Sequence, residues 1–112
     1  MNAPALYFVR FWVNPASHKK VFDYLDNVHL KDVVSQPGFL WARRYKLAQV
    51  DPDGWPGYQM LYAVESLAAL EIYFKSATSA RYREEAARLG LMDDKVVKME
   101  RLWGALEKAV DR

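Results

Sequence analysis

The stretch LYFVRFWV, residues 6–13, followed directly by Asn14-Pro15, sets the interpretation of the whole chain. Its density of aromatic and β-branched residues predicts a strand. Asn14 is a good helix N-cap, and proline suits the first helical position, where a backbone N–H is not needed. A helix is therefore expected from about Ala16 to Val34, with a buried stripe formed by Val21, Phe22, Leu25, Val28 and Val33.

Three more strands and a second helix are predicted further along the chain. The run DPDGWPG, residues 51–57, is a strong turn signal that joins two strands into a hairpin with a longer loop. Ser66 is expected to cap the second helix, which continues to Leu89 with a break near Thr78-Ser79, where hydroxyl side chains compete for backbone hydrogen bonds. The three strands are expected at residues 39–47, 58–64 and 96–103.

The order strand, helix, strand, strand, helix, strand predicts an α+β fold of the ferredoxin-like, split βαβ kind. In this fold one four-stranded antiparallel sheet carries both helices on a single face. The 112 residues are expected to form one domain. Alternation leaves the facing of the second and fourth strands open, but it places the following residues on the helix side: Tyr7, Val9, Phe11, Val13, Tyr58, Met60, Tyr62 and Val64.

The opposite face of the sheet is expected to be a dimer interface. It would present Arg10 and Trp12, residue types that are enriched in protein interfaces. A soluble monomer rarely exposes a large apolar surface of this kind. Two sheets pressed together across a two-fold axis would close an α+β barrel, so a homodimer is predicted.

Composition limits the classes of function that are open to the chain. The 16 basic and 14 acidic residues give a net charge of +2, which argues against a dedicated nucleic-acid-binding protein. There is no cysteine, which excludes disulfides and thiolate chemistry. The N-terminal residues have neither the basic region of a signal peptide nor the length of a membrane span, so a cytoplasmic protein is expected. No phosphate-binding loop or metal-ligand cluster is recognisable, and no cofactor is expected.

His29 is the residue with the clearest chemical potential. It lies four residues after Leu25 and four before Val33, which places it along the buried stripe near the end of the first helix. A partly desolvated imidazole titrates near neutral pH and can act as a general base. The alternative is a structural histidine that fills core volume and bonds to a carbonyl group.

The other candidate site residues are aromatic and basic. Tyr62 is predicted to orient a ligand by donating a hydrogen bond, although it can equally be a core residue. Arg43 or Arg44 would bind a carboxylate or enolate, unless the pair is one surface charge and one ion pair. The run RYREEAARLG, residues 81–90, is interpreted as a solvated helix face. The remaining residues expected at a ligand cleft are Phe11, Tyr24, Met60 and Tyr73.

Three segments, YFVRFWVNP, HLKDVVSQPGFLWARRYKL and GYQMLYAVESLAALEIYF, together resemble the dimeric α+β barrel superfamily. The chain looks nearest to small uncharacterised bacterial proteins related to the ethyl-tert-butyl-ether-degradation-type and antibiotic-biosynthesis-monooxygenase-type domains. The likeness covers about residues 5–104. It is carried by His29, Phe39, Tyr58 and Tyr62 and by the tract SARYREEAARLG.

The resemblance implies a ligand site between sheet and helices, and activity without a metal or organic cofactor. The expected function is a monooxygenase, isomerase or cyclase type of reaction on a small aromatic or polyketide-like molecule. Haem-degrading members carry a histidine on the second helix, and this chain has none between Leu67 and Leu89, so haem is not expected. One alternative is a dimer that only binds a ligand or partner. A more remote one is an RNA-recognition domain, whose signature is partly matched by Leu6-Tyr7-Phe8 and Gly57-Tyr58.

Overall fold

One antiparallel sheet of four strands forms the centre of the structure, a computed structural model that describes residues 3–112. β1 (Ala5–Val13) pairs with β3 (Pro56–Val64) on one side and with β4 (Val97–Ala105) on the other. β2 (Phe39–Val50) pairs with the far side of β3, so the strand order is β2-β3-β1-β4. This is the ferredoxin-like α+β fold that the order of segments predicts.

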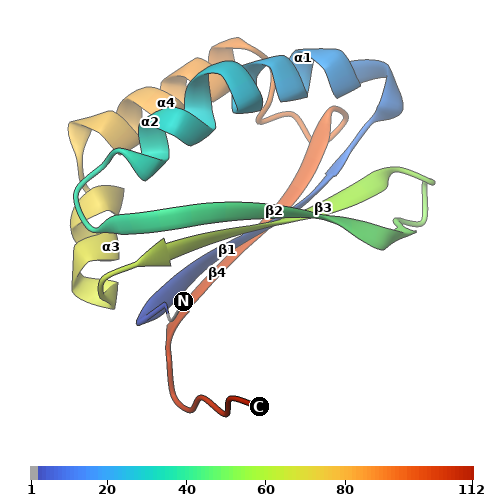
Figure 1. Ribbon diagram of the computed structural model, residues 1–112. Helices are drawn as coiled ribbons and strands as arrows, with labels where there is room; N and C mark the ends of the chain where they lie inside the picture. The colour runs from blue at the N-terminus through green and yellow to red at the C-terminus, as the bar shows by residue number, and fades with distance from the viewer. Residues whose placement is uncertain (1–2) are drawn as a thin grey trace.

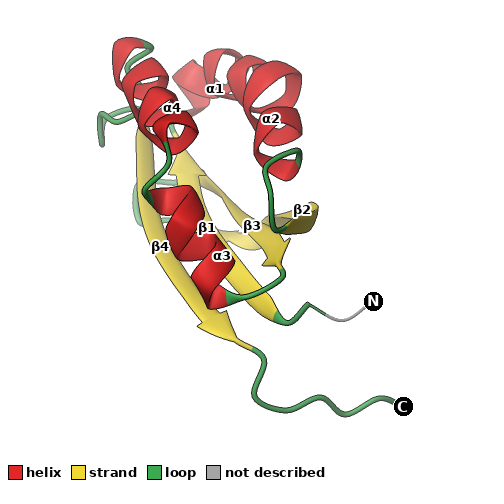
Figure 2. Ribbon diagram, turned by 90° about the vertical axis from the view of Figure 1, so that its left-hand side faces the viewer, coloured by secondary structure: helices red, strands yellow, loops and turns green. Residues whose placement is uncertain are grey.

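The helices all lie against one face of the sheet and leave the other face uncovered (Figures 1 and 2). The first helical stretch is continuous, but its hydrogen bonding changes along its length. In chain order the elements are the 3-10 turn η1 (Pro15–Ser17), α1 (His18–Tyr24), the π-helical turn η2 (Leu25–His29), α2 (Leu30–Val34), α3 (Leu67–Phe74) and α4 (Ala77–Arg88).

Alternation along the two central strands determines which side chains fill the core. Every second residue of β1 from Tyr7 to Val13 is buried, and so is every second residue of β3 from Tyr58 to Val64. The structure thus confirms the facing predicted for both strands. The helices complete the core with Val21, Phe22, Val33, Leu70, Tyr73 and Tyr82.

The pairing register determines the facing of β2 and β4. Arg44 is opposite Met60, so its side chain is on the helix side, and its neighbour Arg43 is on the uncovered side. In β4, Arg101 is opposite Val9, which places Arg101 on the helix side as well. The sequence alone could not make these assignments because both strands carry polar and apolar residues on each face.

Two details of the helices correct the sequence-based expectations. The second helical stretch breaks at Lys75-Ser76 rather than near Thr78-Ser79, because the Ser76 hydroxyl accepts a hydrogen bond from the backbone N–H of Ser79 (3.1 Å) and so caps α4. Val28, predicted in the buried stripe, is 43% exposed. A π turn takes up more residues than an α turn, so η2 rotates Val28 away from the sheet.

The loop between β2 and β3 is tied to β4, two strands away from β3 in the sheet. Lys98 of β4 forms ion pairs with Asp51 and with Asp53, both at 2.6 Å, and its ammonium group lies 4.4 Å from the centre of the Trp55 ring. Asp51 also accepts hydrogen bonds from the backbone N–H groups of Asp53 and Trp55. Trp55 is therefore part of a closed hairpin tip.

Gly38, between α2 and β2, provides a test of how tightly the helix layer joins the sheet. Its φ is +88°, and a Cβ at this position would lie 2.8 Å from the Cβ of Ala69 in α3. We expect Gly38→Ala to lower the free energy of unfolding by about 2–4 kcal/mol, through backbone strain and the steric clash. Gly54→Ala is the matched control, because Gly54 has a φ of +81° but open space around it. The control should lose only about 1–2 kcal/mol in denaturant unfolding, and equal losses would contradict tight packing at Gly38.

Candidate functional site

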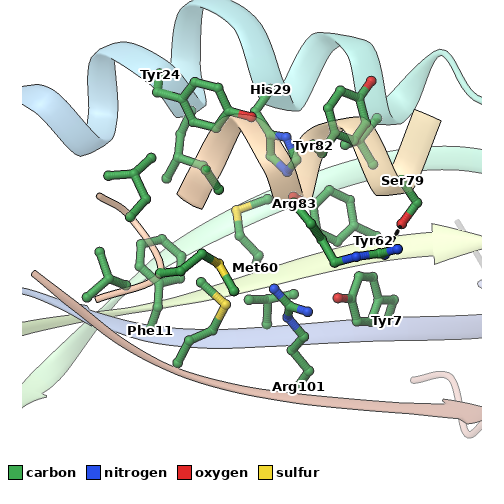
Figure 3. A pocket seen from close by; sticks show the side chains of 18 of the residues that line it. Tyr7, Phe11, Tyr24, His29, Met60, Tyr62, Ser79, Tyr82, Arg83 and Arg101 are labelled. Atoms are coloured by element: carbon green, nitrogen blue, oxygen red, sulfur yellow. Dashed lines mark hydrogen bonds between the residues drawn. The ribbon is translucent and has the colours of Figure 1, made fainter. Parts of the chain in front are cut away.

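A cavity of about 140 Å³ lies between the helices and the sheet (Figure 3). Its walls come from β1, β3 and β4 below, from the helices above, and from Leu91 and Met92 in the connection between α4 and β4. Most of its lining is aliphatic or aromatic. The polar or titratable side chains that line it are Tyr7, Tyr24, His29, Tyr62, Tyr73, Ser79, Tyr82, Arg83 and Arg101.

The cavity exists because aromatic rings stand on either side of the middle of the sheet. The ring centres of Phe11 and Tyr58 are 5.4 Å apart in a stacked pair, and those of Tyr7 and Tyr62 are 5.6 Å apart. Between these pairs, β1 and β3 present only the opposed residues Val9 and Met60 on the helix side. The rigid rings hold the helices away from the sheet, and the smaller central pair does not fill the space.

His29 enters this cavity from the last position of the π turn η2. π turns within helices are rare and frequently occur at functional sites. The imidazole ring stacks on Tyr24 with 5.5 Å between ring centres and lies edge-on to Tyr82 at 4.8 Å. These two rings orient it, and Figure 3 shows it directed from its helix into the cavity.

Burial controls the charge of His29. It lowers the pKa of the imidazole from 6.5 to about 4, because removal from water disfavours the charged form. Glu85 and Asp32 act in the opposite direction with a smaller effect. The ring is therefore neutral at pH 7. Its Nδ1 atom is buried and has no hydrogen-bond partner within residues 3–112, so a partner from outside the chain is needed to satisfy it.

The tyrosines predicted for the site are held in their protonated form. Tyr24 donates a hydrogen bond to Glu85 Oε2 (3.3 Å), and burial together with this carboxylate raises the pKa of Tyr24 to about 12. Burial also raises the pKa of Tyr62 and of Tyr73 above the ordinary value of 10. All three phenols can therefore donate hydrogen bonds at neutral pH.

Arg43 and Arg44, the arginines proposed from sequence as anion partners, do not line the cavity. Arg43 is on the uncovered face of the sheet, where its guanidinium group lies 5.0 Å from the centre of the Trp41 ring. Arg44 is on the helix side but is ion-paired with Asp26 at 2.6 Å. The six other predicted residues do line the cavity: Phe11, Tyr24, His29, Met60, Tyr62 and Tyr73.

Sequence reasoning missed several residues that the structure brings to the cavity. Arg101 comes from β4, and Ser79, Tyr82 and Arg83 come from α4. The interpretation of residues 81–90 as a solvated face is wrong for Tyr82, which is 4% exposed and whose hydroxyl is buried without a partner in the described chain. One signal in the sequence could have identified them. Tyr82 and Arg83 follow Ser79 by three and four residues, so the three side chains lie on the same face of a helix.

The RNA-recognition alternative requires aromatic residues on an open sheet face. Tyr7 and Tyr58, the tyrosines of the two matching segments, are buried on the side that the helices cover. The helices therefore prevent bases from stacking on either ring.

Across residues 3–112, no three or more His, Asp or Glu side chains converge where they could hold a metal ion. None of the described helices is both long and apolar enough to cross a membrane.

Comparison with known proteins identifies the family of the chain. The family described as Domain of unknown function (DUF4286) matches residues 4–102, so the protein belongs to this family. No curated protein matches the sequence.

Solved structures share the fold at low sequence identity. An antibiotic-biosynthesis-monooxygenase-type protein from Deinococcus radiodurans has a TM-score of 0.69 at 8% identity, over 96% of this chain and 97% of that one. A dimeric ferredoxin-like protein from an uncultured marine organism has a TM-score of 0.62 at 16% identity, over 96% and 99%. SnoaB, a cofactor-independent oxygenase from Streptomyces nogalater, has a TM-score of 0.52 at 15% identity, over 99% and 100%. The ferredoxin-like α+β fold expected from the sequence is thus confirmed.

The lowered pKa of His29 predicts a specific pH dependence of stability. Between pH 6.5 and pH 4 the unfolded chain binds a proton at His29 that the folded protein does not bind, so acidification favours unfolding. Above pH 6.5 neither state binds this proton. The loss across the window is of the order of 3 kcal/mol. Because His29→Phe has no imidazole to protonate, its free energy of unfolding should fall by about 3 kcal/mol less than that of the wild type between pH 7 and pH 4. Denaturant unfolding at the two pH values measures this difference.

His18→Phe is the matched control for this experiment. His18 is the other histidine of the chain and is exposed at the start of α1. Its replacement should leave the acid dependence of the wild type intact. A His29→Phe curve parallel to that of the wild type would contradict a buried, neutral imidazole.

Proposed function

We propose that the protein is a homodimeric α+β barrel enzyme that carries out cofactor-independent proton transfer or oxygenation on a small aromatic or polyketide-like molecule. The observation that carries this proposal is His29, a neutral imidazole in an aromatic-lined cavity with a buried nitrogen that no group of residues 3–112 satisfies. Monooxygenase, isomerase and cyclase reactions of this type share a first step, the removal of a proton from an activated C–H or O–H group. His29 is the proposed base in that step.

Tyr62 is the proposed partner of His29. Its phenol stays protonated and can donate a hydrogen bond to the substrate oxygen on which negative charge develops. With a pKa of about 4, His29 is a weak base, so removal of a proton from a phenol or from a carbon beside a carbonyl group is uphill, and the hydrogen bond from Tyr62 must stabilise the anion that forms. The proton moves to the imidazole and the electron pair to the substrate oxygen. The resulting anion can be reprotonated at another atom or react with oxygen.

The size of the cavity and the structural likenesses support a small ring as substrate. A volume of about 140 Å³ is close to that of an engineered apolar cavity, roughly 150 Å³, that binds benzene. SnoaB, described as a cofactor-independent oxygenase, has the same fold. A dimer that binds such a ligand without transforming it is the second candidate, favoured by the low basicity of His29.

Hydrogen exchange on a neutral ketone tests the proposed base. 2-Indanone is compact and has carbon-bound protons beside its carbonyl group, and NMR in D₂O follows their replacement by deuterium. We expect the wild type to accelerate this exchange and His29→Ala to reduce the protein-dependent rate by about 10²- to 10⁴-fold. His18→Ala is the control and should exchange like the wild type.

Each outcome of the exchange experiment has a defined meaning. Equal rates for the wild type and a folded His29→Ala variant would exclude His29 as the base. Binding of 2-indanone with no acceleration by the wild type would contradict the enzyme and favour the ligand-binding dimer.

Dimerisation through the uncovered sheet face is the second part of the proposal. Leu102 and Tyr45 are 67% and 58% exposed on this face. Arg10 on this face is matched within the sheet by Gln59 (2.9 Å) and Glu100 (3.5 Å), and the guanidinium group of Arg43 lies over the Trp41 ring. A second copy across a two-fold axis would cover these apolar groups. The likeness to a dimeric ferredoxin-like protein supports this arrangement.

Leu102→Glu tests this interface by placing a charge on the uncovered face. We expect sedimentation at micromolar concentration to show a dimer for the wild type and a monomer for this variant, because burying an unpaired carboxylate is costly. Ile72→Glu is the matched control, since Ile72 is an equally exposed apolar residue (71%) on α3, on the helix side of the molecule. A monomeric wild type, or dissociation by Ile72→Glu alone, would contradict the proposed interface.

A cytoplasmic location and the lack of a nucleic-acid partner also belong to this proposal. They are supported by the absence of cysteine and by the net charge of +2.

A further inference from the structure

Two arginines converge on the open side of the cavity. Arg83 reaches it from α4 in the helix layer and Arg101 from β4 in the sheet (Figure 3). Both residues are exposed to solvent. Arg83 donates a hydrogen bond from Nη1 to Ser79 Oγ at 2.9 Å, which holds the guanidinium group in place and leaves its other donors for a ligand.

No carboxylate balances these two charges. The residues that line the cavity include neither Asp nor Glu. Within residues 3–112, neither Arg83 nor Arg101 takes part in an ion pair. The nearby acid Glu85 is engaged elsewhere, since it accepts a hydrogen bond from Tyr24 and pairs with Arg81 at 3.8 Å. The cavity therefore carries an excess of two positive charges.

The positive charge of Arg101 acts electrostatically on the tyrosines that line the cavity. The charge of Arg101 acts to lower the pKa of Tyr7, Tyr62 and Tyr73, although burial outweighs it in each case. An anion bound between the two guanidinium groups would be attracted by both. A forked guanidinium group matches a carboxylate with two parallel hydrogen bonds.

We propose that the cavity binds small ring compounds that carry a carboxylate group, with the carboxylate on Arg83 and Arg101 and the ring between the sheet aromatics and His29. This rests on the proposed function, because it names the substrate class of the same site. It also adds a physical consequence. A bound anion facing His29 raises the basicity of the imidazole and so improves the base that the cavity otherwise weakens.

Benzoate and benzamide are suitable probes because they have the same ring and nearly the same shape but differ in charge. In titration calorimetry at low salt, we expect benzoate to bind at least about 10-fold more tightly than benzamide. Arg83→Gln and Arg101→Gln should each weaken benzoate binding by about 10- to 100-fold and leave benzamide binding unchanged. Equal affinities of the wild type for the two probes would overturn the proposal.

Two further variants separate this inference from the proposed function. Arg88→Gln removes the same charge from an exposed position of α4 outside the cavity, and it should leave benzoate affinity unchanged. If Arg88→Gln lost as much benzoate affinity as Arg83→Gln and Arg101→Gln, the loss would be an effect of net charge alone, and the proposed site would be refuted. His29→Ala should still bind benzoate while it loses the exchange reaction on neutral 2-indanone. If the wild type prefers benzoate to benzamide but does not accelerate exchange on 2-indanone, only the proposed enzyme is refuted. If it accelerates exchange but binds the two probes equally, only the anion site is refuted.

Discussion

The packing of aromatic rings on the helix side of β1 and β3 is the interaction on which the rest of the structure depends. Tyr7 and Tyr62 meet Phe74 and Phe39 at one end of the sheet, and Phe11 and Tyr58 meet Phe22 at the other. Rings are large and rigid, so they fix the distance between the sheet and the helix layer at both ends. The space above the central residues is then left unfilled. The cavity follows from where the rings stand, and Leu91 and Met92 of the connection between α4 and β4 complete its wall.

The same layering separates charged from neutral groups. Deep in the cavity, burial keeps His29 unprotonated and the phenols protonated, since desolvation disfavours every charged form. The charged residues that line the cavity, Arg83 and Arg101, are at its open side and are exposed to solvent. A ligand that enters thus contacts the positive charges of Arg83 and Arg101 first. Further in it reaches the neutral imidazole of His29, a proton acceptor, and the tyrosine phenols, which are hydrogen-bond donors. This order suits a molecule with an anionic end and an apolar ring.

Local patterns in the sequence were sufficient to predict much of this protein. The strand and helix order, the facing of β1 and β3 and the position of His29 near the buried stripe depend on spacing within one element, and each central strand has one wholly apolar face. The π turn was not predictable, because it is defined by backbone hydrogen bonds rather than by a residue pattern. The bulge between Phe39 and Trp41 was equally hidden, and it interrupts the simple alternation that the sequence of β2 suggests.

The amino-acid sequence by itself determined the ferredoxin-like fold, the core of the two central strands and the presence of a histidine and tyrosines between sheet and helices. Only the tertiary structure decided which arginines reach that space. The sequence placed Arg43 and Arg44 on the strand that follows the helix of His29, and both were candidates for the site. The register of β2 turns Arg43 to the uncovered face, and Asp26 forms an ion pair with Arg44. Arg83 and Arg101 take the position instead. The direction of a side chain on a mixed strand is set by pairing with its neighbours, and that pairing is a property of the folded sheet rather than of the strand.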